Sequence, residues 1–151
     1  MVCLGNICRS PLAEGVLRHK LNEAGITNVS VDSAGTSGQH SGENPDPRAV
    51  SNAWRNGVDI FAIVSRKFSV ADFDKFDRIY VMDQSNYRDV MNLARTDEHR
   101  NKVELFLNIS SPGKNKAVHD PWYGGDEGFQ RVFDLVNETC VILINELKTN
   151  K

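Results

Sequence analysis

Short strand-like segments alternate with amphipathic helical segments along this chain, and the alternation limits the folds that it can adopt. The strand-like segments are residues 1–2, 28–35, 78–82 and 102–107. The segments with helical periodicity are residues 10–25, 46–57, 69–76, 85–94 and 129–147. Strands that alternate with helices favour right-handed βαβ units around a parallel sheet. We therefore expect a three-layer α/β/α fold with a central, mostly four-stranded parallel sheet, which would bind ligands beyond the carboxyl ends of its strands.

The C-terminal helical segment has the clearest period. Its apolar residues are spaced by four, three, four, three and four positions: Phe129, Phe133, Val136, Cys140, Leu143 and Leu147. This spacing places them on one face of a helix, so we expect Cys140 to be a core residue. In the first helical segment we expect Ser10 to be the N-cap and Pro11 the first helical residue.

Composition and charge are typical of one globular domain. The 151 residues are 40% hydrophobic and contain no linker-like stretch, so we expect a single domain over residues 1–151. The 18 basic and 20 acidic residues form no long run of one sign, which argues against nucleic acid and membrane partners. The sequence shows no signal peptide and no apolar run of roughly 18 residues. Its three cysteines are an odd number at irregular spacing, which argues against the disulfide framework of a secreted protein. We therefore expect a cytoplasmic protein.

The stretch VCLGNICRSP, residues 2–11, lies where a strand ends and a helix begins. Backbone N–H groups and a helix N-terminus at such a junction favour a bound anion, and phosphate is the natural candidate. Gly5 and Asn6 tolerate the positive φ angles that let a loop curl, and Arg9 offers a fork of donors to two phosphoryl oxygens. The phosphate-binding loop after the first strand is expected to comprise Leu4, Gly5, Asn6, Ile7, Cys8, Arg9 and Ser10.

Cys3 lies at the base of this loop, where the helix dipole, Arg9 and the Ser10 hydroxyl favour a thiolate. A thiolate that faces phosphorus is a nucleophile for phosphoryl transfer. Five residues separate Cys3 from Arg9, which is enough to wrap a tetrahedral anion so that both ends of the loop contact it.

Three other interpretations of the same residues remain open at this point. A zinc site would need four ligands, but Cys140 belongs to a helical core face and the four histidines are scattered. Cys3 and Cys8 would form a redox pair if the curled loop brings them within disulfide reach. The loop could also be purely structural, but Arg9 would then be buried without an anionic ligand, and burial of an unpaired charge costs free energy.

Three blocks of the sequence resemble the low-molecular-weight protein tyrosine phosphatase family and follow that family's order. They are VCLGNICRSP at residues 2–11, VDSAGTSGQHSGENPDPRA at residues 31–49 and DPWYGG at residues 120–125. The resemblance covers nearly the whole chain. It implies a phosphatase that hydrolyses phosphotyrosine and small aryl phosphates through a cysteinyl-phosphate intermediate, with no cofactor and no metal. We expect a tyrosine-phosphorylated protein as substrate, and a monomer or weak dimer.

The resemblance also implies catalytic roles. Asp120 would protonate the departing phenolate and then act as the base for the hydrolytic water, with Cys3 as nucleophile. Arg9 would bind the phosphoryl group in the ground state and the transition state. Ser10 would stabilise the thiolate as the leaving group of the second step.

Further residues would support the loop and line the substrate pocket in a chain that resembles this family. Asn6 and Ser33 resemble the hydrogen-bonded pair that holds the loop open. Trp122 and Tyr123 resemble the aromatic pair that would sandwich a phenyl ring at the pocket mouth. Gln39 would lie at the pocket wall.

The sequence departs from the family pattern in a few places. Gln39 stands where many relatives have an aromatic residue, and Ile63 falls near a position often held by a histidine that supports the loop. Only two residues precede Cys3, so we expect a shortened first strand. Ile7 stands where relatives that act on phosphoarginine have threonine, which favours an aryl phosphate as substrate.

Two functions of other classes remain as alternatives. One is a thiol-based arsenate reductase that uses Cys3 and Cys8. Such relatives use additional cysteines further along the chain, and here the only later one is Cys140. The other is a non-catalytic phosphotyrosine-binding module. Such a module needs neither a nucleophile nor a general acid, so the presence of Cys3 and Asp120 disfavours it.

Overall fold

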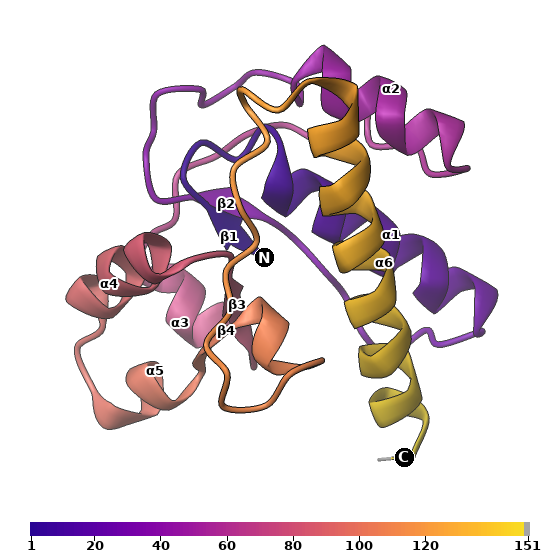
Figure 1. Cartoon of the computed structure of the whole chain (residues 1–151). Coiled ribbons are helices and arrows are strands. Elements are labelled where there is room, and N and C mark those ends of the chain that lie inside the picture. The colour runs from indigo at the N-terminus through magenta and orange to yellow at the C-terminus, as the bar shows by residue number, and fades with distance from the viewer. Residues whose placement is uncertain (150–151) are drawn as a thin grey trace.

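A four-stranded parallel sheet forms the centre of the computed structural model, which describes residues 1–149 (Figure 1). The strands are β1 (Val2–Cys3), β2 (Ala34–Gly35), β3 (Ile79–Val81) and β4 (Val103–Leu105). Their order is β2-β1-β3-β4, and Val2 of the central strand lies opposite both Ala34 and Val81. The predicted α/β class with a four-stranded parallel sheet is confirmed.

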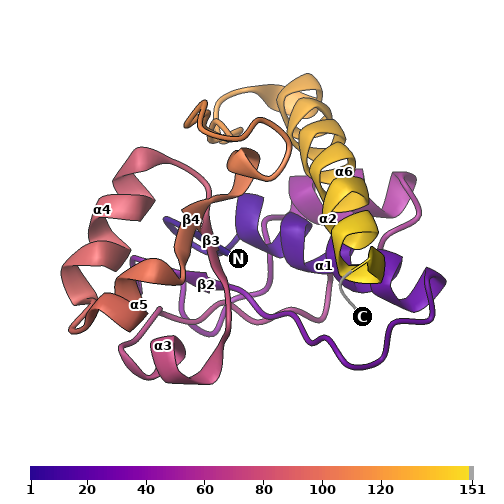
Figure 2. The same cartoon turned by 90° about the horizontal axis from the view of Figure 1, so that it is seen from below.

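Helices cover both faces of this sheet, as Figure 2 shows. On one face lie α1 (Arg9–Glu23), α2 (Pro47–Arg55) and α6 (Gly125–Thr149). On the other lie α3 (Ala71–Lys75), α4 (Gln84–Leu93) and α5 (Asp97–Asn101), and a 3-10 helix, η1 (Phe106–Asn108), follows β4. Side chains of β3 alternate between the faces, so that Tyr80 packs in the first hydrophobic cluster and Ile79 and Val81 in the second. The sheet is thus the middle of three layers.

Two sequence predictions about element boundaries are wrong. Residues 28–35 were expected to form a strand, but only Ala34 and Gly35 pair, because β1 beside them offers just two residues. Ser10 was expected to be the N-cap of the first helix and Pro11 its first residue, but α1 begins at Arg9 and its N-cap is Cys8. The Ser10 hydroxyl instead lies inside the first helical turn and hydrogen-bonds with the side chains of Cys3 and Asn6.

Gly35 brings the carboxyl end of β2 close to the loop that follows β1. The N–H of Thr36 donates to the carbonyl of Cys3 at 2.9 Å, and the N–H of Ser37 donates to that of Leu4 at 2.9 Å. A Cβ atom on Gly35 would lie 2.8 Å from the carbonyl oxygen of Leu4 and 3.0 Å from that of Ser37. Glycine is therefore required where the two chain segments meet.

The 25-residue helix α6 packs along α1 on one face of the sheet. Its buried face includes Phe129, Phe133, Val136, Cys140 and Leu143, as the spacing predicted. Burial raises the pKa of the Cys140 thiol to about 12. Within residues 1–149 no helix, α6 included, combines the length and the apolar character that a membrane span requires.

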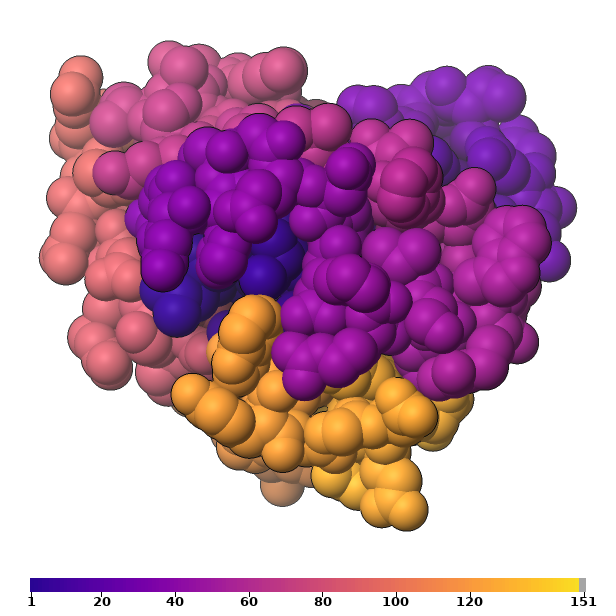
Figure 3. Space-filling model, turned by 90° about the horizontal axis from the view of Figure 1, so that it is seen from above, coloured from indigo at the N-terminus to yellow at the C-terminus, as the bar shows by residue number. Residues whose placement is uncertain are grey.

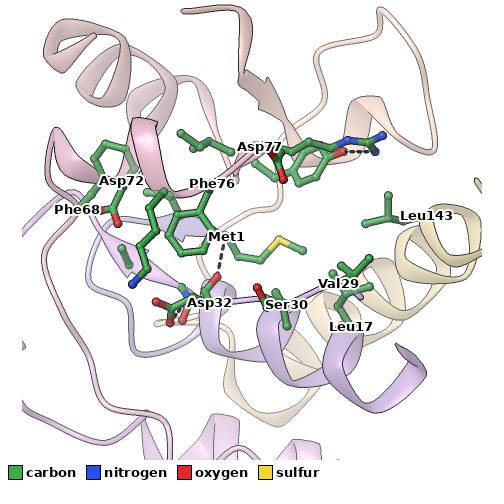
Figure 4. Close-up of a pocket in the computed structure, with 18 of the residues that line it drawn as sticks. Met1, Leu17, Val29, Ser30, Asp32, Phe68, Asp72, Phe76, Asp77 and Leu143 are labelled. Atoms are coloured by element: carbon green, nitrogen blue, oxygen red, sulfur yellow. Dashed lines mark hydrogen bonds between the residues drawn. The ribbon is translucent and has the colours of Figure 1, made fainter. Parts of the chain in front are cut away.

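A cavity of about 410 Å³ lies at the amino ends of the strands, away from Cys3 (Figure 4). Met1, Asp32, Phe76 and Leu143 are among the residues in its wall. The α-amino group of Met1 donates to the backbone carbonyl of Asp32 at 3.0 Å, and burial lowers the pKa of this amino group to about 6. The cavity therefore lies between the segments that flank the short β1, at the opposite end of the sheet from the phosphate loop.

Candidate active site

The phosphate loop was predicted as residues 4–10; residues 4–8 join the end of β1 to the start of α1, and Arg9 and Ser10 belong to the first turn of α1. Asn6 has a φ of 56°, in the left-handed region, whereas Gly5 does not take the positive φ that the sequence suggested. A Cβ atom on Gly5 would lie 3.1 Å from the Cδ2 atom of His40, so a larger residue there would require the imidazole to shift by a few tenths of an ångström. Figure 3 shows the first residues of the chain at the floor of a hollow, between the segments around residues 40 and 120.

Cys3 is the buried nucleophile candidate at the base of the loop. Its side chain is 3% exposed, and its Sγ lies 3.0 Å from the Oγ of Ser10. That Oγ accepts a hydrogen bond from the Nδ2 of Asn6 at 2.7 Å, and the nearest alternative acceptor for its own hydrogen, the carbonyl of Ala34, is 3.5 Å away. The Ser10 hydroxyl is therefore arranged to donate to the sulfur, which stabilises a thiolate.

Asn6 holds the loop in its left-handed conformation through both ends of its amide. The Nδ2 atom donates to Ser10 and, at 2.9 Å, to the Oγ of Ser33, while the Oδ1 atom accepts from the N–H of Arg66 at 3.1 Å. The Ser33 hydroxyl in turn donates to the Oε1 of Glu14 at 2.6 Å. The structure thus brings together Asn6 and Ser33, the two residues that the sequence named as loop support.

Arg9 is fixed by an acidic partner that the sequence analysis missed. Its Nη1 donates to the Oδ2 of Asp83 at 2.7 Å and to the carbonyl of Val118 at 2.9 Å, and the side chain is 3% exposed. Asp83 is also the N-cap of α4, because its Oδ1 accepts from the N–H of Asn86. Its place just after β3, at the ligand-binding end of a parallel sheet, was the signal that could have identified it.

Asp120 lies on the segment that leads into α6, across the hollow from the loop. Its Oδ2 is 3.8 Å from the Nη2 of Arg9, and its side chain is 49% exposed. The N–H of Trp122 donates to its other oxygen, Oδ1, at 3.0 Å. One carboxylate oxygen therefore accepts a hydrogen bond within the turn, and the other faces the Arg9 guanidinium, which would hold a phosphoryl group.

The predicted pocket residues differ in exposure. Trp122 is partly exposed and Tyr123 is 96% exposed, and both follow Asp120 on the segment that borders the hollow. Gln39 is exposed, and its side chain makes no hydrogen bond within residues 1–149. Its neighbour His40, which the sequence analysis did not single out, packs against Gly5 and hydrogen-bonds to Glu43 at 2.8 Å.

The three cysteines carry no disulfide in the part of the chain that the structure describes. Cys3, Cys8 and Cys140 are free thiols. Burial, together with the nearby Asp46 carboxylate, raises the pKa of the Cys8 thiol above its ordinary range. Residues 1–149 contain no group of three or more His, Cys, Asp and Glu side chains that would hold a metal ion.

Known proteins are similar to this chain in sequence and in fold. A family model described as low molecular weight phosphotyrosine protein phosphatase matches residues 1–151. The low molecular weight phosphotyrosine protein phosphatase of Schizosaccharomyces pombe is 45% identical over 130 residues, which are 85% of this chain and 82% of that protein.

Two solved structures match nearly the whole chain. A protein tyrosine phosphatase from Entamoeba histolytica, with Hepes in its active site, has a TM-score of 0.90 at 35% identity, over 99% of this chain and 95% of that one. A Drosophila arginine phosphatase has a TM-score of 0.90 at 28% identity, over 99% of this chain and 97% of that one.

Proposed function

The chain belongs to the low molecular weight phosphotyrosine protein phosphatase family, and we propose that it hydrolyses phosphotyrosine through a phosphocysteine formed on Cys3. The observation that carries the proposal is the setting of Cys3. Its sulfur is buried at the carboxyl end of the central strand, 3.0 Å from the Ser10 hydroxyl, at the base of a loop that ends in Arg9. This arrangement favours both a thiolate and a bound phosphoryl group.

In the first step the Cys3 thiolate attacks phosphorus, and the bond from phosphorus to the phenolic oxygen breaks. Arg9 and the backbone N–H groups of residues 4–8 hold the three equatorial oxygens. The Asp120 carboxyl, in its protonated form, gives its proton to the phenolate as that oxygen departs. The products of this step are a free tyrosine side chain and a phosphocysteine.

In the second step water attacks the phosphocysteine, and the bond from phosphorus to sulfur breaks. The Asp120 carboxylate, which lost its proton in the first step, now takes one from the attacking water. The Ser10 hydroxyl donates to the departing thiolate, as its 3.0 Å contact with Sγ allows. Inorganic phosphate leaves, and Cys3 and Asp120 return to their starting states.

The aromatic and apolar side chains at the rim of the hollow favour an aryl phosphate as the substrate. Trp122 supplies an aromatic wall for a phenyl ring, Tyr123 and Gln39 extend that rim, and Ile7 contributes an apolar loop side chain. The proposed substrate is a tyrosine-phosphorylated protein, acted on in the cytoplasm by a single phosphatase domain that works as a monomer or weak dimer. No metal, cofactor or nucleic acid takes part in the proposed reaction.

The proposal is tested by phosphate release from matched peptides that carry phosphotyrosine, phosphoserine or phosphoarginine, with a chelator present. We expect release from the phosphotyrosine peptide at a kcat/KM at least about 10-fold above the other two, because the pocket selects an aryl group. Faster release from the phosphoarginine peptide would assign a different substrate. Thioredoxin-coupled arsenate reduction without phosphate release would favour the reductase alternative.

We expect Ser10→Ala to slow the second step more than the first. The variant removes the donor to the departing sulfur, so the phosphocysteine should accumulate and kcat should fall by about 10-fold, with a smaller change in kcat/KM. Rapid-quench measurement of the burst of phenol release separates the two steps. A Ser41→Ala variant, in the neighbouring loop, controls for the loss of a hydroxyl. A parallel fall of burst rate and kcat would contradict the role of Ser10.

A further inference from the structure

Arg48 joins α2 to the segment that carries Asp120. Its Nη1 donates to the backbone carbonyl of Trp122 at 2.7 Å. Its Cζ lies 5.0 Å from the ring centroid of Trp122 and 5.0 Å from that of Phe129, both within the range of cation–π attraction. Arg48 therefore contacts the chain just before α6 and within the first turns of α6.

Asp46 fixes the orientation of this arginine. Its Oδ1 accepts from the Nε of Arg48 at 3.1 Å and its Oδ2 accepts from Nη2 at 2.9 Å, which is a two-point contact with the guanidinium plane. The Asp46 side chain is 7% exposed, and the hydrogen bond from Arg48 lowers its pKa below the ordinary range. The carboxylate is thus charged and fixed at neutral pH.

The same aspartate is tied to the phosphate loop through its backbone. The N–H of Asp46 donates to the carbonyl of Ile7 at 2.8 Å. Ile7, Asp46, Arg48 and Trp122 therefore form a continuous series of contacts from the phosphate loop to the segment that holds the general acid. The contacts that Arg48 makes with Asp46 and Trp122 are charge-assisted hydrogen bonds, and the contact between Asp46 and Ile7 is a backbone hydrogen bond.

The Asp120 segment, residues 119–123, makes few other hydrogen bonds, although Val118 just before it bonds to Met82 and Arg9, and Pro121 within it is buried. Among residues 1–149, the hydrogen bond from Arg48 is the one that ties residues 119–123 to another element of the fold. The hydrogen bond from Trp122 to Asp120 lies within the segment, and Arg9 faces Asp120 only at 3.8 Å. Arg48 is therefore the residue of another element whose side chain hydrogen-bonds to this segment, two positions after Asp120.

We propose that Arg48 is a positioning residue that holds Asp120 at the leaving oxygen and Trp122 at the pocket wall. The inference rests on the proposed role of Asp120 as the general acid. Without the guanidinium, the segment samples positions in which the acid is too far from the phenolic oxygen. Because displacements of about 1 Å can cost catalysis up to about 100-fold, proton donation should suffer while phosphoryl binding by Arg9 is retained.

The test compares Arg48→Met with Arg55→Met, a control on the same helix whose guanidinium donates to the Ser51 hydroxyl at 3.3 Å, away from the Asp120 segment. With phenyl phosphate, which needs protonation of its leaving oxygen, we expect Arg48→Met to lower kcat/KM by about 10-fold or more. With p-nitrophenyl phosphate, a better leaving group, we expect a loss below about 3-fold. Arg55→Met should match the wild type on both esters.

A double-mutant cycle with Asp120→Asn separates positioning from general destabilisation. If Arg48 acts through the acid, Arg48→Met should cost little further activity once the acid is absent. Equal losses on the two esters, or an undiminished loss in the Asp120→Asn background, would overturn the inference. A wild type that hydrolyses neither ester would instead overturn the proposed function itself.

A measurement independent of activity examines the same contact. In a Trp54→Phe background Trp122 is the remaining tryptophan. Loss of the guanidinium over its ring should increase quenching of its fluorescence by acrylamide in Arg48→Met and leave it unchanged in Arg55→Met. Unchanged quenching in Arg48→Met would show that Arg48 does not hold the segment, whatever the substrate of the enzyme.

Discussion

Replacing Cys3 with serine should reduce phosphate release from aryl phosphates and phosphotyrosine peptides by at least about 10⁴-fold. A serine hydroxyl in place of the sulfur remains protonated at neutral pH and is a weak nucleophile without an adjacent base. The two carboxylates beside Arg9, those of Asp83 and Asp120, face its guanidinium, whereas Cys3 contacts the Ser10 hydroxyl. Initial rates measured with freshly reduced protein, with a chelator present, provide the comparison.

The Cys3→Ser variant should still fold and still bind phosphate. The serine oxygen is smaller than the sulfur but can still hydrogen-bond with Ser10, so the melting temperature should stay within a few degrees of the wild type. Isothermal titration with a phosphotyrosine peptide should show binding, because Arg9 and the loop N–H groups are unchanged. Residual activity near the wild-type level, or equal loss of activity in a folded Cys140→Ala variant, would contradict a nucleophilic Cys3.

Asp120→Asn should give the second largest effect, and its size should depend on the leaving group. For phenyl phosphate the loss in kcat/KM should reach about 10²–10³-fold, and for p-nitrophenyl phosphate about 10-fold, because a good leaving group needs little protonation. Asparagine keeps the side-chain oxygen that accepts from the N–H of Trp122, so the turn is preserved. A series of substituted phenyl phosphates measures this dependence as the slope of log kcat/KM against leaving-group pKa.

Asp83→Asn serves as the acidic control for that series. Asp83 contacts Nη1 of Arg9, and the guanidinium separates it from the leaving oxygen. Removal of its charge should therefore weaken phosphate binding by Arg9 equally for every ester. If Asp120→Asn lowered all esters by the same factor, or if Asp83→Asn steepened the leaving-group slope, Asp120 would not be the general acid.

Local sequence patterns predicted most of the fold because each is a property of neighbouring residues. The helical spacing from Phe129 to Leu147 marks α6, and the apolar stretch around Tyr80 marks β3. The strand at residues 28–35 was overestimated, because apolar alternation does not reveal how many residues its neighbour offers for pairing. The N-cap of α1 was misplaced because Ser10 has a stronger interaction, with the loop side chains and Cys3.

The sequence predicted the part of the site whose residues are contiguous. It missed residues that reach the site from positions far away in the sequence. Residues 3–10 carry their chemistry in one stretch, so the phosphate loop could be recognised as a unit. The contacts from Arg9 to Asp83 and from Arg48 to Trp122 each span 74 positions, and no local pattern reports such a pairing. Asp83 and Arg48 therefore became visible only in the folded chain.

The covalent intermediate is the most direct test of the account. The wild-type enzyme is mixed with an aryl phosphate, quenched with acid within milliseconds, and examined by peptide mass spectrometry with fragmentation that distinguishes Cys3 from Cys8. We predict a phosphoryl group on Cys3 at early times, at a level that the Ser10→Ala variant increases. Phosphate release at the full rate with no phosphoryl group on Cys3, or with the group on another residue, would contradict the account.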